Sequence, residues 1–156
     1  MNQLNSDILR EIGTLSRCIH SICDIKFKEL ELQKGQFIYL TRICENPGIS
    51  FIELTMLLKL DKTSTTKAIQ KLETEGYIKR DKDTNDKRVT RLYPTEKGLK
   101  CYDNIIDEEN RNIGICLNDF SEYETNIVTK LIRKMSDNIE SEWKHSKSLL
   151  RGHGND

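Results

Sequence analysis

Residues 59–98 pair a short amphipathic helix with a charged hairpin, and few folds accommodate that order of elements. The helix is predicted over residues 62–75, because Ala68, Ile69 and Leu72 fall on one apolar face at helical spacing. The opposite face is left to polar side chains that can meet a partner. These polar residues are Ser64, Thr65, Lys67, Gln70 and Lys71.

A two-stranded hairpin is predicted after this helix. Gly76 supplies the left-handed residue that ends the helix, and residues 77–80 and 89–93 are predicted as short strands. Residues 81–88 between them form a polar tip, in which Thr84-Asn85-Asp86 favours a turn. A helix followed by a charged hairpin is the layout of a winged helix that reads DNA.

A second helix precedes the first across a short turn. Ser50 and Glu53 have the spacing of a capping box, in which each side chain satisfies a free amide at the helix start. The helix should run to about Leu58 and bury Leu54, Leu57 and Leu58. Asp61 or Thr63 can then cap the following helix. The pair of helices predicts a helix-turn-helix. Upstream, residues 35–45 are predicted as a helix and Ile49 as a very short strand.

Both ends of the chain are predicted to form long amphipathic helices. They cover about residues 4–29, residues 95–117, and a last segment that Ser121 and Glu124 open with another capping box. The stripe of the first helix consists of Leu4, Ile8, Ile12, Leu15, Ile19 and Ile22. A small middle domain cannot cover all of these apolar stripes. A second copy of the chain is therefore expected to cover the rest. A monomeric helical bundle is the alternative.

We therefore expect a mainly α-helical protein: a winged helix-turn-helix DNA-binding domain with long N- and C-terminal helices that form a homodimer interface. Residues 1–34 are predicted as an N-terminal dimerisation helix and residues 35–98 as the winged domain. Residues 99–150 are predicted as C-terminal dimerisation helices, and residues 151–156 as a disordered tail.

Charge is balanced overall but unevenly distributed. Lys and Arg number 25, as do Asp and Glu, so the formal net charge is zero. Residues 59–91 carry ten basic and six acidic side chains, a net charge of +4, whereas residues 103–142 carry four and ten, a net charge of −6. This separation suits a protein with one face toward phosphate. A solvated charge run is the alternative.

The sequence also bears on location. Its first residues lack the basic start and apolar core of a secretory signal, and no apolar stretch approaches the ~20 residues of a membrane span. The odd number of cysteines, without framework spacing, indicates reduced thiols and a cytoplasmic protein with no membrane partner. These are Cys18, Cys23, Cys44, Cys101 and Cys116.

Several motifs resemble one family along nearly the whole chain. Asp86-Lys87-Arg88 is followed after six residues by Thr95-Glu96-Lys97-Gly98, and residues 15–20 and 36–40 also fit the family pattern in order and spacing. The chain resembles the MarR (multiple-antibiotic-resistance regulator) family of bacterial winged-helix transcription factors. Pro94 departs from the pattern, which has leucine there, and is expected to be harmless at a strand end.

The resemblance implies a homodimer that binds a pseudo-palindromic double-stranded operator, usually as a repressor. It implies that the helix over residues 62–75 enters the major groove, while Arg88, steadied by Asp86, enters a flanking minor groove. The expected DNA-binding residues are Ser64, Thr65, Thr66, Lys67, Gln70, Lys71, Lys82, Asp86, Lys87 and Arg88.

The resemblance also implies two ways of sensing a signal. Family members often bind phenolic or aromatic carboxylate effectors, and Arg17, His20, Phe37 and Thr41 resemble positions that line their pocket. Some members use a reactive cysteine in the first helix, where Cys18 and Cys23 lie, although buried inert thiols are the simpler interpretation.

Other classes of function find less support. On a helix, Cys18, His20 and Cys23 spread around the axis at ~100° per residue, so no metal site is expected. The scattered histidines suggest no catalytic arrangement, and neither an enzyme nor a cofactor is expected. A winged-helix module that binds another protein through its helix and hairpin is the rival from a different class.

Overall fold

The computed structural model describes residues 3–152 and divides into two units, one up to Asn112 and one from Ile113 onward. Its elements follow in this order: α1 (Ile8–Lys26), the 3-10 helix η1 (Phe27–Leu30), α2 (Gln36–Glu45), β1 (Ile49–Ser50), α3 (Phe51–Leu58), α4 (Lys62–Thr74), β2 (Ile78–Lys82), β3 (Thr90–Pro94), α5 (Glu96–Cys116) and α6 (Glu122–Gly152). The chain is mainly helical with a small antiparallel sheet, as the sequence predicts.

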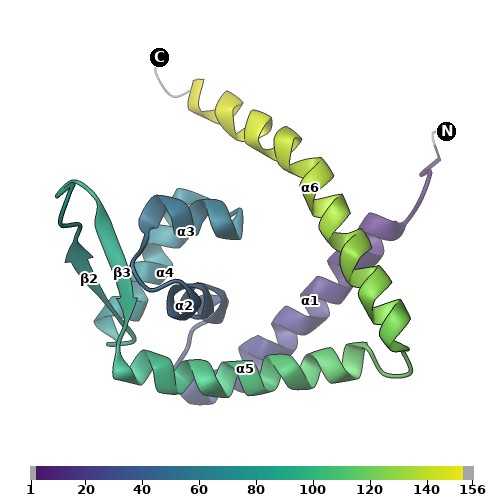
Figure 1. Ribbon diagram of the computed structural model, residues 1–156, viewed down its shortest axis with the longest axis horizontal. Coiled ribbons are helices and arrows are strands. Elements are labelled where there is room, and N and C mark those ends of the chain that lie inside the picture. The colour runs from purple at the N-terminus through teal and green to yellow at the C-terminus, as the bar shows by residue number, and fades with distance from the viewer. Residues whose placement is uncertain (1–2, 153–156) are drawn as a thin grey trace. The chain divides into compact units, whose positions relative to one another are not determined.

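The core of the first unit forms around α2, which packs against α3, α4 and β3 (Figure 1). Leu40 and Ile43 of α2 are fully buried. They share the core with side chains from every neighbouring element, including Leu54, Ile69, Leu72, Leu92 and Ile105. The apolar spacing of residues 62–75 predicted the inward face of α4 correctly at Ile69 and Leu72, with Ala68 half-buried at its edge.

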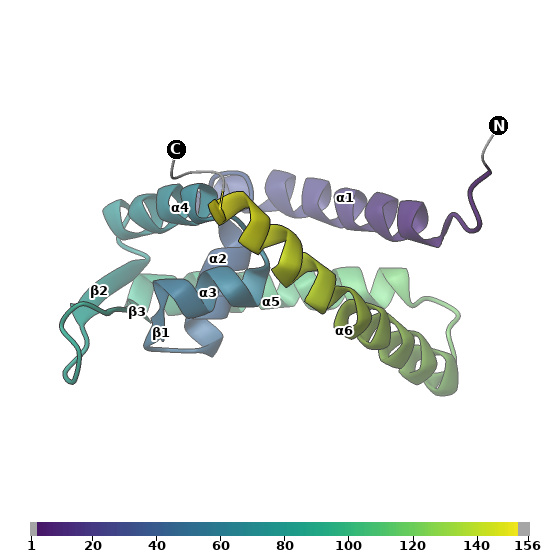
Figure 2. The same ribbon diagram turned by 90° about the horizontal axis from the view of Figure 1, so that it is seen from above.

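The sheet has the strand order β1-β3-β2, with Leu92 paired to Ile49 on one side and to Arg80 on the other. The hairpin ladder extends further than the sequence predicted, to Lys82 opposite Thr90. Backbone hydrogen bonds from Asp83 to Val89 (3.0 Å) and from Val89 to Asp86 (2.8 Å) close the tip tightly enough to continue the ladder. In Figure 2 this tip extends past the helices of its unit.

The predicted capping box at the start of α3 is present. The Ser50 backbone N–H donates to the Glu53 carboxylate (2.7 Å), and the Glu53 N–H donates to the Ser50 hydroxyl (3.2 Å). Leu57, however, is 48% exposed, so the prediction that it is buried is wrong. Because α3 is only eight residues long and turns sharply at Lys59, it buries mainly the face of Leu54.

The first helix is shorter than predicted. α1 ends at Lys26, and the backbone tightens into η1 before Glu31, whose left-handed φ of 59° turns the chain. Two contacts fix this change of direction: the Gly35 N–H donates to Asp24 (2.9 Å), and the Tyr77 hydroxyl donates to the Leu30 carbonyl. The segment after α1 is thus anchored to the winged domain.

The second unit contains the end of α5 and all of α6. Its helix starts with the predicted capping box, in which the Ser121 N–H donates to Glu124 (2.9 Å) and the Glu124 N–H donates to Ser121 (3.2 Å). α6 continues to Gly152, into the tail predicted at 151–156, and residues 153–156 lie outside the described residues. Within residues 3–152, none of the helices is long and apolar enough to cross a membrane.

Candidate nucleic-acid interface

The start of α4 is fixed by Asp61 rather than Thr63. The Asp61 carboxylate accepts the Ser64 N–H (2.8 Å), and its backbone carbonyl accepts both the N–H (3.1 Å) and the hydroxyl (2.8 Å) of Thr65. The hydrogen bond from the Ser64 backbone favours the ionised carboxylate and lowers the pKa of Asp61, so the cap persists further into the acid range. An anchored first turn is what a helix needs in order to present side chains at fixed positions.

The outward face of α4 carries most, but not all, of the predicted polar contacts. Ser64, Thr66, Lys67 and Gln70 are exposed, and Lys71 is half-buried beside Glu75, with which it forms an ion pair at 3.1 Å. Thr65, predicted on this face, is instead fully buried.

The burial of Thr65 follows from its position in the helix. It lies four residues before Ile69, on the same inward stripe, and its side chain shares a hydrogen bond with buried Tyr39 of α2. Because its hydroxyl also bonds to the Asp61 carbonyl, Thr65 fastens α4 to the core. It is therefore excluded from the candidate interface.

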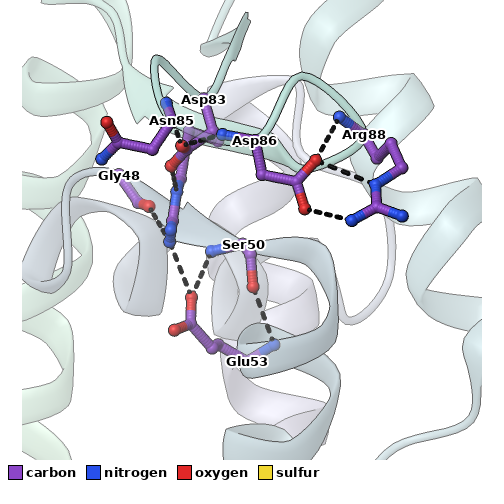
Figure 3. Close-up of polar contacts among 8 residues, drawn as sticks. Gly48, Ser50, Glu53, Asp83, Asn85, Asp86 and Arg88 are labelled. Atoms are coloured by element: carbon purple, nitrogen blue, oxygen red, sulfur yellow. Dashed lines mark hydrogen bonds and ion pairs between the residues drawn. The ribbon is translucent and has the colours of Figure 1, made fainter.

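At the tip of the hairpin, Arg88 is held open to solvent. Its side chain is 91% exposed, and the guanidinium donates to both carboxylate oxygens of Asp86 (3.0 Å each), which also accepts the Arg88 N–H (Figure 3). This fork lowers the pKa of Asp86 and raises that of Arg88. The pair presents a charged, preoriented guanidinium. Lys82 and Lys87 are exposed nearby in the sequence of the hairpin.

A second network beneath the tip was missed by sequence reasoning. Asp83 accepts the backbone N–H groups of Asn85 (2.8 Å) and Asp86 (2.9 Å), as Figure 3 shows, and the guanidinium of Arg91 (2.7 Å). These hydrogen bonds, the Asp86 amide first, lower the pKa of Asp83 to about 2. An aspartate at the start of a polar turn was the available signal, since such residues bond to the amides that follow.

The residues predicted for an effector pocket are brought together only in part. The rings of His20 in α1 and Phe37 in α2 lie 5.7 Å apart. Arg17, one turn before His20, is exposed and donates to Thr14 (3.0 Å). Thr41 is fully buried, and its hydroxyl donates to the Ile38 carbonyl, so it presents no surface to a ligand here.

The first-helix cysteines differ in environment. Cys18 is exposed, whereas Cys23 is buried, receives a hydrogen bond from Asn112 (3.7 Å), and has its pKa raised to about 11, chiefly by burial. Burial likewise raises the pKa of Cys44 to about 12 and that of Cys101 to about 11. These three thiols stay protonated at neutral pH, which disfavours reaction with oxidants.

Two helices joined by a short turn, followed by a hairpin that completes a three-stranded sheet and projects an arginine, define a winged helix-turn-helix protein. A sequence model described as the MarR family matches residues 32–90. The chain is 40% identical to the HTH-type transcriptional regulator YybA of Bacillus subtilis, over 91% of this chain and 95% of that protein. The chain therefore belongs to the MarR family, and it is a transcriptional regulator.

Solved structures agree with this placement. A MarR protein from Peptoclostridium difficile has 57% sequence identity and a TM-score of 0.88, with 94% of this chain and 95% of that chain covered. A Listeria monocytogenes protein described as a MarR-family transcriptional regulator was crystallised with a 26-mer DNA. It has 41% identity and a TM-score of 0.89, with 100% of this chain and 98% of that chain covered.

Proposed function

We propose that the protein is a homodimeric repressor that binds a pseudo-palindromic operator, with α4 in the major groove and Arg88 in a flanking minor groove. The observation that carries this proposal is the fully presented Arg88 guanidinium, held by Asp86 at the tip of a projecting hairpin. The narrow minor groove of A·T-rich DNA has a deep negative potential that favours arginine.

The exposed face of α4 supplies what base edges and phosphates require. Hydroxyl, amide and ammonium groups can donate or accept hydrogen bonds in the major groove, where each base pair presents its own pattern. The proposed DNA contacts are Ser64, Thr66, Lys67, Gln70, Lys71, Lys82, Lys87 and Arg88, with Asp86 orienting Arg88. A regulator that acts on chromosomal DNA works in the cytoplasm, where we place it.

Unpartnered apolar side chains on the end helices support the dimer. On α1, Ile8, Leu9 and Leu15 are 49%, 70% and 49% exposed. Dimer operators place their half-sites about one DNA turn, ~34 Å, apart, so the proposed dimer must hold its two α4 helices at that spacing. Proteins rarely leave such apolar stripes open to water.

Substitution of Arg88 tests the proposal. A DNA duplex that the wild-type protein selects from a random pool serves as the operator, and the affinity of each protein for it is measured by fluorescence anisotropy. Arg88→Ala should weaken binding by ~1–3 kcal/mol or more, with the greatest loss on duplexes whose flanks are A·T-rich. Unchanged affinity of the Arg88→Ala protein would show that the hairpin does not read DNA.

Two lysine substitutions serve as controls for that measurement. Lys82→Ala should weaken binding to all sequences alike and flatten the salt dependence by about one unit, as expected for one lost phosphate contact. Lys100→Ala removes the same charge from an exposed ion pair with Glu96 on α5, and it should leave both affinity and salt dependence unchanged.

We further propose that a small aromatic carboxylate or phenol controls operator binding from a site beside His20 and Phe37. The contact between these rings joins α1 to the winged domain, so a ligand there can alter the spacing of the two α4 helices. Arg17 is exposed one turn away and can hold a carboxylate with its guanidinium. Thr41 is left out because it is fully buried.

Arg17→Ala should blunt effector release more than it harms DNA binding. Salicylate, titrated to millimolar concentration into the protein–DNA complex, is expected to release wild-type protein but not this variant. Peroxide is the comparison: release by peroxide alone, abolished by Cys18→Ser or Cys23→Ser, would favour a redox signal and exclude the pocket.

A further inference from the structure

We propose that Arg91 is a positioning residue for DNA reading: it locks the hairpin tip, and through it Arg88, at a fixed place relative to α3. The inference rests on the proposed function, because it concerns how accurately Arg88 reaches the minor groove. Arg91 is the second residue of β3, paired with Asp81 of β2 and with Ser50 of β1, and its side chain is 31% exposed.

A continuous chain of contacts leads from Arg91 to Arg88. The Arg91 Nε donates to Asp83 Oδ2 (2.7 Å), and Asp83 Oδ1 accepts the Asp86 backbone N–H (2.9 Å). The Asp86 carboxylate in turn holds the Arg88 Nε and Nη2 (3.0 Å each). Asp83 connects the two arginines, because its Oδ2 accepts from Arg91 while its Oδ1 accepts the amides of Asn85 and Asp86. Figure 3 shows the hydrogen bonds from Asp83 to these two amides.

At its other end, Arg91 contacts the helix-turn-helix. Its Nη1 donates to the Gly48 carbonyl (3.2 Å), in the turn before β1, and to Glu53 Oε2 (3.1 Å). The same Glu53 oxygen accepts the Ser50 N–H and so belongs to the capping box of α3. The Arg91 guanidinium therefore joins the hairpin tip, the turn before β1 and the first turn of α3.

The geometry favours a role in positioning over one in stability. The Glu53 side chain is 59% exposed, and an exposed ion pair of this kind contributes little to folding free energy. The Asp83 side chain is only 15% exposed, and its second oxygen holds the turn that carries Arg88. The planar Arg91 guanidinium donates to several acceptors in fixed directions. These hydrogen bonds restrict how the hairpin tip moves relative to β1 and α3. A hairpin tip that is already ordered loses less entropy when it binds DNA, so the Arg91 contacts should increase the affinity for DNA.

Lysine cannot reproduce this lock. Arg91→Lys keeps the positive charge. Its single ammonium group, however, cannot donate to Asp83, Gly48 and Glu53 at once, as the forked guanidinium does. Asp83→Asn keeps an oxygen for the Asn85 and Asp86 amides but turns the group facing Arg91 into a neutral amide. These two variants break the same connection from either side while preserving the charge or the turn.

The experiment is a double-mutant cycle between positions 91 and 88 on the selected duplex. Arg91→Lys should weaken binding about tenfold, while Arg91→Lys in the Arg88→Ala background should change affinity less than about twofold, because the route through Arg88 is already lost. Asp83→Asn should behave in the same way. Arg42→Lys, the same substitution at an ion pair with Glu45 on α2, is the matched control and should bind normally.

The outcomes separate the inference from the proposed function. If Arg88→Ala weakens binding but the two substitutions add independently, Arg91 contacts DNA itself and the inference is overturned. Full binding by Arg91→Lys would also overturn it, because only charge would then matter. If Arg88→Ala binds normally, the proposed function itself fails. Thermal melting must show that each variant is folded, and should Arg91→Lys fail this check, Asp83→Asn decides.

Discussion

Gly98→Ala is expected to destabilise the winged domain by more than ~3 kcal/mol, beyond the usual cost of one extra methyl group in a core. A Cβ on Gly98, in the first turn of α5, would lie 2.1 Å from the Tyr77 carbonyl oxygen. That oxygen is held by hydrogen bonds from the N–H (3.0 Å) and hydroxyl (3.1 Å) of Thr95. Relief of the clash must therefore move backbone, and urea unfolding followed by circular dichroism measures the loss.

Gly114→Ala is the matched control on the same helix. A Cβ there meets nothing within 4 Å, so alanine should stabilise α5 by up to ~1 kcal/mol through its higher helix propensity. Equal stability of the Gly98→Ala and wild-type proteins would mean that the helix start does not pack against Tyr77 as described.

Leu131→Asp is expected to abolish the proposed dimer. Leu131 is 53% exposed on α6 in the single chain, and a substitution at such a position in a monomer changes stability by only ~0.5 kcal/mol or less. If a second copy covers it, an unpaired carboxylate is buried, at a cost of ~2–4 kcal/mol in association. Sedimentation at several protein concentrations distinguishes the two cases.

Asn126→Asp adds the same charge at an exposed polar position of α6 and should leave the association unchanged. A Leu131→Asp protein that sediments like the wild type would exclude this face of α6 from the interface. The two substitutions together separate an effect of charge from an effect of buried position.

The starts of α3 and α6 and the inward face of α4 could be predicted because their signals are local. Capping boxes at Ser50 and Ser121 depend on residues three positions apart, so sequence alone sufficed to place both helix starts. Helical spacing similarly gave Ile69 and Leu72 as the inward face of α4. The resemblance carried by the hairpin motif led to the family that the comparisons show.

Placement of individual side chains required the tertiary structure. Thr65 is a polar residue and is therefore expected at the surface. It can be buried because its hydroxyl forms hydrogen bonds with Asp61 and Tyr39. Helical spacing puts Thr65 on the inward stripe with Ile69, but only the tertiary structure supplies the partners that its hydroxyl needs there. Leu57 is apolar and is therefore expected in the core, but α3 is too short to bury it. For Leu57 the deciding factor is what the rest of the fold places opposite the side chain, which residue type and helical spacing do not specify.

By itself, the sequence determined the helices, the hairpin and the exposed arginine at its tip, because each depends on residues close together in the chain. Only the tertiary structure decided what holds that tip. Arg91 meets Gly48 and Glu53, 43 and 38 residues earlier in the sequence. These partners come within hydrogen-bonding distance because β1 pairs with β3, a contact between segments far apart in the sequence that local signals do not specify.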